Sequence, residues 1–317
     1  MPALKDIEYK EINGIKVDKE NDEAFFNDET HTYYNKETMQ KYVSVTTLIH
    51  NYSQEFNEDF WASYKALEAI LPEEEWFALR NQLLNTKKIP KNLFSVISID
   101  KDTFEVKKNE ILEEYAVKRK TATDRGTLIH AQFENNFYGN KNIDFKKFGC
   151  DGLHGNFECK KDYYKLDLQQ GVYPEFFISL VSRDGVLRVA GQVDCLIVDD
   201  FDVYIIDFKT NKEIKKTSYF NKNKKSHEMM KFPLNNLQDC NYNHYQLQLS
   251  TYAYLMQQIN PKYNIKKLLL YHIDHDGNET IIPCDYLKED VERMLKHYKK
   301  QSKIHDELNR IKPVEIC

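Results

Sequence analysis

The stretch GQVDCLIVDDFDVYIIDFKT, residues 191–210, contains two apolar runs separated by the acidic segment DDFD. Runs rich in β-branched and aromatic residues predict β-strands, and the Asp-rich segment between them predicts a tight turn. Aspartate is depleted in strands, yet Asp194 and Asp207 each lie within a predicted strand, and Lys209 follows Asp207 by two residues. The predicted hairpin therefore has charged residues at positions where strands usually have apolar core residues.

The second strand of this hairpin is predicted to begin apolar and end charged on one face. Side chains of a strand alternate between its two faces. Asp194 can meet Asp207 across the hairpin if the register allows, and two close carboxylates repel each other unless a proton or a cation intervenes. Oxygen ligands suit Mg²⁺ or Mn²⁺, and an adjacent amine could orient a water or neutralise charge on a phosphate. The alternative is an ordinary Asp–Lys surface pair. The residues that share the face are Val203, Ile205, Asp207 and Lys209.

Composition indicates a folded globular protein and excludes several other classes. The chain has 317 residues, of which 41% are hydrophobic and 13% aromatic. No stretch approaches the ~20 apolar residues of a membrane span, and the N-terminal MPALKDIEYKEING lacks the apolar centre of a signal peptide. We therefore expect a soluble, cytoplasmic protein without a membrane partner. The six cysteines form no C-x-x-C pair, so neither disulfides nor a structural zinc site is expected.

A lysine-rich segment directly follows the predicted hairpin. The net charge of −5 does not indicate nucleic-acid binding, but a local patch can bind against the global sign. The functional interpretation is a loop that contacts phosphates, and the alternative is a solvated surface loop. Between residues 209 and 231, two glutamates at 213 and 228 oppose lysines at 209, 212, 215, 216, 222, 224, 225 and 231.

Periodicity and turn residues predict the remaining elements. Helices, an antiparallel meander, a further helix and further strands follow one another, which predicts an α/β or α+β core with a helical N-terminal region. The expected elements are strands and turns up to residue 50, a helix entering at Leu48 and capped by Ser44 or Thr46, helices over 60–84 with a new start at Pro72, a connection over 85–102, one or two helices over 104–138 with a restart near Asp124, a short helix through Tyr163, Tyr164 and Leu168, strands over 172–209, a helix over 243–258, a hairpin over 265–283 and a helix over 286–308.

The segment GQVD followed by IIDFKT resembles the core of the PD-(D/E)XK nuclease superfamily, in particular its RecB-like exonuclease branch of phage and mitochondrial-genome-maintenance type. In that branch G-x-x-D precedes D-[YF]-K-T, which assigns Asp194, Asp207 and Lys209 to the two acidic positions and the lysine. The proline of the superfamily's name is missing. The resemblance covers about residues 120–260. It implies an α/β restriction-endonuclease-like core, a mixed central sheet flanked by helices, over residues 121–317, after strands and a helical region over residues 1–120.

Two upstream features match the same branch. The stretch DRGTLIHAQFE, residues 124–134, resembles a family helix that carries a histidine after R-G-T. The resemblance makes His130 a further metal ligand and places Arg125 among the substrate-binding residues. Glu175 in VYPEFF matches an upstream glutamate that assists the metal site. The alternatives are a structural histidine and a glutamate that faces solvent.

One downstream feature also matches. The family carries Q-x-x-x-Y on a helix after the catalytic strand, and Gln248 and Tyr252 in YQLQLSTYAYL fit it. Residues four apart share a helix face, and by resemblance this face meets the substrate. Thr210 and Lys212, next to the lysine of the motif, are expected to contact the substrate as well. The alternative is an ordinary helix surface and core.

The resemblance implies a Mg²⁺-dependent deoxyribonuclease, with Mn²⁺ as a substitute. The expected reaction is exonucleolytic hydrolysis of phosphodiester bonds in linear DNA, single-stranded or end-resected, during phage-type replication, recombination or repair. DNA is the expected partner, and a single-strand annealing or replication protein is a further candidate. The expected catalytic residues are Asp194, Asp207, Lys209 and Glu175, and the expected metal ligands are His130, Asp194, Asp207 and the backbone carbonyl of Phe208.

Several alternatives and exclusions accompany this expectation. The fold could also serve a structure-specific endonuclease or a catalytically silent DNA-binding scaffold. The segment YHIDHDGN, residues 271–278, offers a second set of metal-binding side chains but is typical of a hairpin turn. Only Cys284 and Cys317 lie near the C-terminus, so we expect no iron–sulfur cluster. The sequence contains no P-loop motif of an ATP-driven motor.

Overall fold

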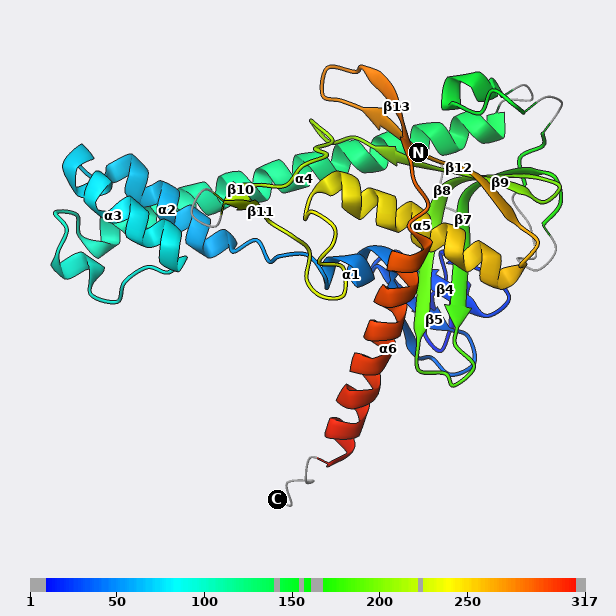
Figure 1. The fold of residues 1–317 in the computed structure, drawn as a ribbon, viewed down its shortest axis with the longest axis horizontal. Helices are drawn as coiled ribbons and strands as arrows, with labels where there is room; N and C mark the ends of the chain where they lie inside the picture. Colours follow the sequence, from blue (N-terminus) through cyan, green and yellow to red (C-terminus); the bar gives the residue numbers. More distant parts are fainter. Residues whose placement is uncertain (1–9, 140–142, 154–156, 161–167, 222–224, 312–317) are drawn as a thin grey trace, which may run out of the picture. The chain divides into compact units, whose positions relative to one another are not determined.

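The computed structural model describes residues 10–139, 143–153, 157–160, 168–221 and 225–311. The chain forms two compact units, one of Met1–Gln54 with Ile129–Cys317 and one of Glu55–Leu128 (Figure 1). This division differs from the boundary expected after residue 120. The N-terminal strands belong to the main sheet, and in the sequence residues 55–128 of the helical unit separate them from the later strands of that sheet.

A mixed sheet organises the first unit, which confirms the expected fold class. Among the described residues it has nine strands in the order β13-β12-β9-β8-β6-β5-β4-β3, with β7 on the other edge of β8. β12 runs parallel to β9 and β6 parallel to β8, whereas the other pairs are antiparallel. The strands are β3 (Lys19–Glu20), β4 (Ala24–Asn27), β5 (Thr32–Asn35), β6 (Lys41–Ser44), β7 (Gly171–Val181), β8 (Arg188–Asp199), β9 (Asp202–Lys209), β12 (Asn264–Ile273) and β13 (Glu279–Cys284).

The predicted hairpin is confirmed as β8 and β9. Its turn holds Asp200 at a φ of 53°, a left-handed conformation that aspartate tolerates better than most residues. Two small hairpins lie outside the main sheet, and the second of them belongs to the lysine-rich segment. They are β1 (Glu11–Ile12) with β2 (Ile15–Lys16), and β10 (Phe220–Asn221) with β11 (Ser226–His227).

Helices cover both faces of the sheet. On one face, α5 (Asn241–Ile259) contributes Leu247 and Leu255 to a core with Val203 of β9, and α6 (Lys288–Ile311) packs into the same core. The short helix α1 (Val45–His50) also joins this core. Of the two predicted caps, Ser44 is the one used, and it accepts a hydrogen bond from the Thr47 amide at 3.0 Å. The helix begins at Val45, earlier than the entry expected at Leu48.

The other face is covered by the end of α4 (Lys101–Gly139) and by the short 3₁₀ helix η2 (Phe145–Phe148). Phe137 of α4 packs there among aromatic and aliphatic side chains of β9 and β12. α4 is continuous, so the expected restart near Asp124 is wrong. The helix expected over residues 163–168 lies outside the described residues except for Leu168, which is not helical.

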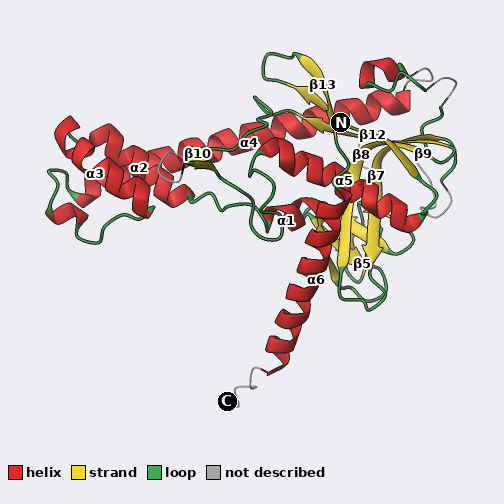
Figure 2. Ribbon diagram, in the orientation of Figure 1, coloured by secondary structure: helices red, strands yellow, loops and turns green. Residues whose placement is uncertain are grey.

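The second unit is entirely helical in its regular structure (Figure 2). It contains α2 (Glu58–Ile70), α3 (Glu73–Thr86), the 3₁₀ helix η1 (Leu93–Ser95) and the larger part of α4. α3 starts directly after Pro72, where the sequence predicts a new helix. Apolar side chains of these helices form the unit's own core. Within the described residues, no helix combines the length and the apolar character that crossing a membrane requires.

Candidate metal and active site

Three carboxylates occupy one level of the sheet on three neighbouring strands. In the antiparallel register of β7 and β8, Glu175 falls opposite Asp194. The last pair of the β8–β9 ladder is Cys195 with Ile206. Asp194 precedes Cys195 and Asp207 follows Ile206, so the same antiparallel register places the two aspartates opposite each other. The expected meeting of Asp194 and Asp207 across the hairpin is confirmed at the level of register.

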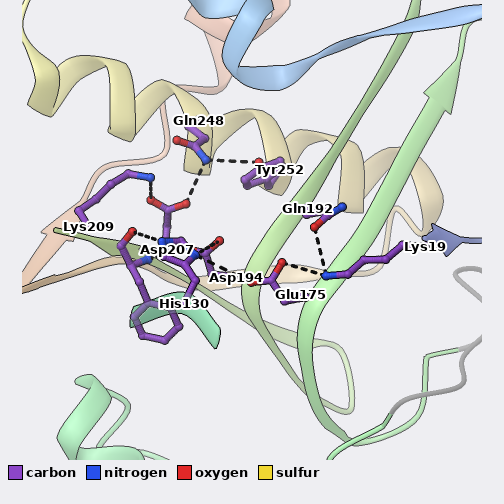
Figure 3. A network of polar contacts seen from close by, with 10 residues as sticks. Lys19, His130, Glu175, Gln192, Asp194, Asp207, Lys209, Gln248 and Tyr252 are labelled. Carbon is purple, nitrogen blue, oxygen red and sulfur yellow. Dashed lines mark hydrogen bonds and ion pairs between the residues drawn. The ribbon is translucent and has the colours of Figure 1, made fainter. Parts of the chain in front are cut away.

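The strand alternation breaks where two of these carboxylates lie. Tyr173 and Phe176 pack into the same core cluster although they are three residues apart, a spacing that a regular strand places on opposite faces. Glu175 between them has a φ of 50°, a conformation that costs a non-glycine residue about 1–3 kcal/mol. β8 shows the same change of face around Asp194. This irregularity brings both carboxylates to His130 (Figure 3).

His130 lies on the part of α4 that belongs to the sheet-containing unit. Its Nδ1 atom is 3.5 Å from Asp194 Oδ1 and 3.9 Å from Glu175 Oε1, and its Nε2 atom is 3.1 Å from the carbonyl oxygen of Phe208. Burial lowers the pKa of the imidazole, but the two carboxylates outweigh burial and raise the pKa to about 10. Without a metal, this raised pKa favours the imidazolium form, which can donate from Nε2 to the Phe208 carbonyl and pair with Asp194 through Nδ1.

The same three side chains could hold a metal ion. The ligand atoms of His130, Glu175 and Asp194 lie within 4.8 Å of one another. Two carboxylates and one imidazole form a donor set that suits Mg²⁺ or Mn²⁺, and a cation there would replace the proton of His130 as the neutralising charge. This group differs from the expected one, because Glu175 belongs to it and Asp207 does not.

Asp207 instead faces α5 and the lysine of its own strand. The carboxylate is 1% exposed, forms an ion pair with Lys209, and accepts a hydrogen bond of 3.0 Å from Gln248 Nε2 (Figure 3). Burial raises the pKa of Asp207 to about 6, against the opposing effect of Lys209 and with reinforcement from Asp194. The predicted shared face of Asp207 and Lys209 is confirmed.

Asp194 has the opposite electrostatic tendency. Burial raises its pKa, but His130, Lys209 and the backbone of Phe208 outweigh burial and leave the pKa below its ordinary value. The amide of Phe208 donates to Asp194 Oδ2 at 2.6 Å, which ties the carboxylate to the end of β9. Two neighbouring carboxylates thus have pKa values pushed apart, an arrangement typical of sites that divide acid and base roles.

Lys209 and Tyr245 complete this part of the site. Burial lowers the pKa of Lys209, but Asp207 and Asp194 raise it overall, so the amine stays charged. The ammonium lies 4.7 Å from the centre of the Tyr245 ring on α5, a distance within cation–π range. Tyr245 was not among the predicted site residues, although its position three residues before Gln248 places it on the same helix face.

Lys19 is the second residue that the sequence analysis missed. From β3 it donates to Glu175 Oε2 at 3.1 Å and to Gln192 Oε1 at 3.2 Å (Figure 3). Lys19 and Glu175 are 156 positions apart in the chain. No local pattern could have joined them, because the contact depends on the N-terminal strands entering the main sheet.

Gln248 and Tyr252 lie together on the buried face of α5. Gln248 Nε2 is 3.3 Å from the Tyr252 hydroxyl as well as bonded to Asp207. The ring of Tyr252 lies directly over Gly191, because a Cβ atom at that glycine would be 2.8 Å from Tyr252 Cε1. Gly191 is thus required by this close approach. Gln248 and Tyr252 both belong to the hydrogen-bond network around Asp207.

The other expected substrate-binding residues are placed differently. Thr210 follows the end of β9 directly, and Lys212 is exposed on the loop beyond it. Arg125 belongs to the helical unit. The segment at residues 271–278 consists of the end of β12 and a hairpin turn over 274–278. In this turn the Asp274 carboxylate accepts hydrogen bonds from the amides of Asp276 and Asn278.

Comparisons with known proteins identify no family. No family model matches the chain, and no curated protein matches it. Among solved structures, SSO0001 is 16% identical with a TM-score of 0.30, and the match covers 62% of this chain and 66% of that one. A "Putative exonuclease" from Eubacterium rectale is 12% identical with a TM-score of 0.34, and the match covers 87% of this chain and 85% of that one. Similarity at this level carries no argument about function.

Proposed function

We propose that this chain is a metal-dependent deoxyribonuclease that hydrolyses phosphodiester bonds. The observation that carries the proposal is the row of Glu175, Asp194 and Asp207 on three adjacent strands. His130 lies beside Glu175 and Asp194, and Lys209 pairs with Asp207. The row separates into a group that can hold a cation and a pair, Asp207 with Lys209, that can handle protons and phosphate charge. The motif resemblance of the hairpin supports the same reaction.

In this proposal His130, Glu175 and Asp194 hold a divalent cation. Such a cation would neutralise phosphate charge and favour ionisation of a nearby water. The Lys209 ammonium binds a non-bridging phosphate oxygen and stabilises the charge that develops there. Asp207, whose pKa of about 6 lies near neutral pH, accepts the proton of the attacking water. Gln248 holds the Asp207 carboxylate in position for this transfer.

The proposed substrate is linear DNA, and the proposed mode is exonucleolytic. The resemblance to the RecB-like branch supports this mode. Closed circular single-stranded DNA separates it from the endonuclease alternative, because an obligate exonuclease cannot cut a molecule without ends. Loss of circular DNA at the rate of linear DNA would establish the endonuclease instead.

The test of the proposal is a time course on DNA labelled at the 5′ or the 3′ end, single- and double-stranded, with Mg²⁺, Mn²⁺ or EDTA. We expect cleavage with either metal and none with EDTA. Asp207→Asn and Lys209→Ala should each abolish cleavage, while thermal unfolding shows that the variants remain folded. Cleavage at the wild-type rate by either variant, or by the wild type in EDTA, would refute the assignment.

A further inference from the structure

A second feature of the sheet-containing unit lies outside the carboxylate site. It is a groove of about 750 Å³ between the loop at Phe232 and α6, and we name it the α6 groove. Its volume lies within the range of ligand sites in proteins. None of the residues that line it belongs to the carboxylate row. The lining that matters here consists of Phe232, Pro233, Arg293, Lys296, His297 and Lys300.

The charge of the α6 groove has one sign. Arg293, Lys296 and Lys300 follow one another at helical steps of three and four residues, so they line one face of α6. Among the described residues that line the groove, none is acidic. No described carboxylate pairs with Lys296 or Lys300, whereas Lys299 and Lys303 of the same helix both pair with Asp184. Lys296 and Lys300 are thus available to a ligand.

An exposed aromatic ring borders these cations. The Phe232 side chain is 69% exposed, and its ring contacts His297 edge-on with 5.3 Å between the ring centres. Its backbone is anchored on both sides, because the Lys231 amide donates to Tyr52 O at 2.6 Å and Leu234 is fully buried. The ring of Phe232 is therefore exposed at a defined position beside the cations of the groove.

The part of the lining formed by Asn236 and Arg293 is also held in place. Asn236 donates to Asp290 Oδ1 at 2.9 Å and accepts from Arg293 Nη2 at 2.9 Å. Asp290 also forms an ion pair with Arg293, which positions the guanidinium on the groove. The groove is therefore preformed, and a ligand would not bear the cost of ordering it.

We propose that the α6 groove binds single-stranded DNA, with a base stacked on Phe232 and phosphates on Lys296 and Lys300. Non-specific sites for single strands combine a basic groove with aromatic rings on which bases stack. An acidic peptide would satisfy the cations but would not require an exposed ring. The combination of an exposed ring with two lysines that have no described carboxylate partner therefore favours a nucleic acid strand.

The choice of DNA as the ligand rests on the proposed function, but its test does not need cleavage. Fluorescence anisotropy with a labelled oligothymidylate in EDTA measures binding by the full-length chain carrying Asp207→Asn, in which cleavage is blocked. Two variants of this protein test the groove, namely Phe232→Ala and the pair Lys296→Ala with Lys300→Ala. All three side chains are exposed, and thermal unfolding checks that the variants fold.

We expect Phe232→Ala to weaken binding at least about fivefold, the lower bound for loss of one stacked base. The double lysine variant should lower the slope of log affinity against log salt concentration by about 1.4, because each phosphate contact on a single strand contributes about 0.7. Matched controls are Phe201→Ala, which removes another exposed ring, and the pair Lys262→Ala with Lys266→Ala. Neither control should change affinity or slope.

The outcomes separate the two proposals. Unchanged affinity and slope in both groove variants would overturn the DNA site, even if the wild type cleaves DNA. Equal losses in the controls would also overturn it, because the binding would then follow net charge and not the groove. If the wild type fails to cleave any DNA but the groove variants lose affinity as expected, the nuclease proposal fails and the binding site stands. Tight binding of an acidic peptide with no measurable binding of oligothymidylate would assign the groove to a protein partner instead.

Discussion

Gln248 on α5 donates a hydrogen bond of 3.0 Å to Asp207 on β9, and so connects the helix motif to the carboxylate row. Gln248→Leu removes this donor and leaves the ion pair of Asp207 with Lys209 in place. We expect the maximal rate of DNA cleavage to fall roughly 10–100-fold, the range observed when a positioning partner of a site residue is lost. The substrate concentration for half-maximal rate should change much less.

The matched control for this prediction is Gln246→Leu. Gln246 is also buried on α5, but its amide donates to the carbonyl of Asp285, away from the carboxylates. The same substitution should therefore reduce stability without the specific loss of rate. Equal losses of rate in both variants would show that α5 packing, and not the bond to Asp207, supports activity.

The stability of the metal-free protein should depend on pH through His130. The carboxylates overcome the effect of burial and raise the pKa of His130 from 6.5 to about 10 on folding. A raised pKa means that the native state binds the proton more tightly, so the stabilisation is complete below pH 6.5 and is lost as pH rises toward 10. Urea unfolding in EDTA should show the wild type losing stability relative to His130→Gln across this window. A constant difference between the two would contradict the assigned imidazolium.

Metal binding should release the proton that His130 carries in the metal-free protein. A metal ligand must be neutral imidazole, so binding a cation to His130 releases the proton. Calorimetric titration of the wild type with Mn²⁺ near neutral pH should give heats that depend on the ionisation enthalpy of the buffer. Affinity should rise with pH up to about 10. Heats independent of the buffer would indicate that the cation binds elsewhere.

Lys19 should support metal binding by holding Glu175. Its ammonium bonds to Glu175 Oε2 at 3.1 Å, next to the strained backbone of that residue. Lys19→Met should weaken Mn²⁺ binding roughly tenfold, because an outer partner of a metal ligand is lost. Lys19→Arg should restore much of the affinity, and Lys36→Met, which removes a lysine that pairs with Glu20, is the control. Tighter binding by Lys19→Met would show that charge repulsion outweighs positioning.

Gly191→Ala tests the close approach of α5 to the sheet. The added Cβ atom would lie 2.8 Å from Tyr252 Cε1 and 3.3 Å from Val45 Cγ2, both in the packed core. We expect a loss of about 1–3 kcal/mol in the free energy of unfolding, the usual effect of overpacking. Gly152→Ala is the matched control, because a Cβ atom there meets nothing within 4 Å. Equal stability of the two variants would contradict the packing.

Local periodicity determined much of the fold. The hairpin of β8 and β9, the shared face of Asp207 and Lys209, and the pairing of Gln248 with Tyr252 on α5 all follow from side-chain spacing within one or two elements. The Ser44 cap is local in the same sense. These predictions held because each depends on a regular backbone over a few residues.

Local spacing could not predict which side chains form the candidate metal-binding group. Strict alternation places Asp194 with Asp207, but the change of face around Glu175 and Asp194 brings these two carboxylates to His130 and leaves Asp207 to Lys209. The residue type gives no indication that the backbone of Glu175 has a positive φ, because glutamate rarely adopts one. It is maintained because the surrounding strands and helices impose it.

The sequence by itself determined the chemical content of this protein, namely two aspartates and a lysine at the end of a hairpin, with a histidine, a glutamine and a tyrosine on helices. Only the tertiary structure decided how they are divided between a candidate metal-binding group and an acid–lysine pair. It also decided that Lys19, from a strand far away in the chain, completes the site. The physical reason is that local spacing sets which face a side chain occupies, whereas contacts between distant strands depend on how the whole sheet is assembled.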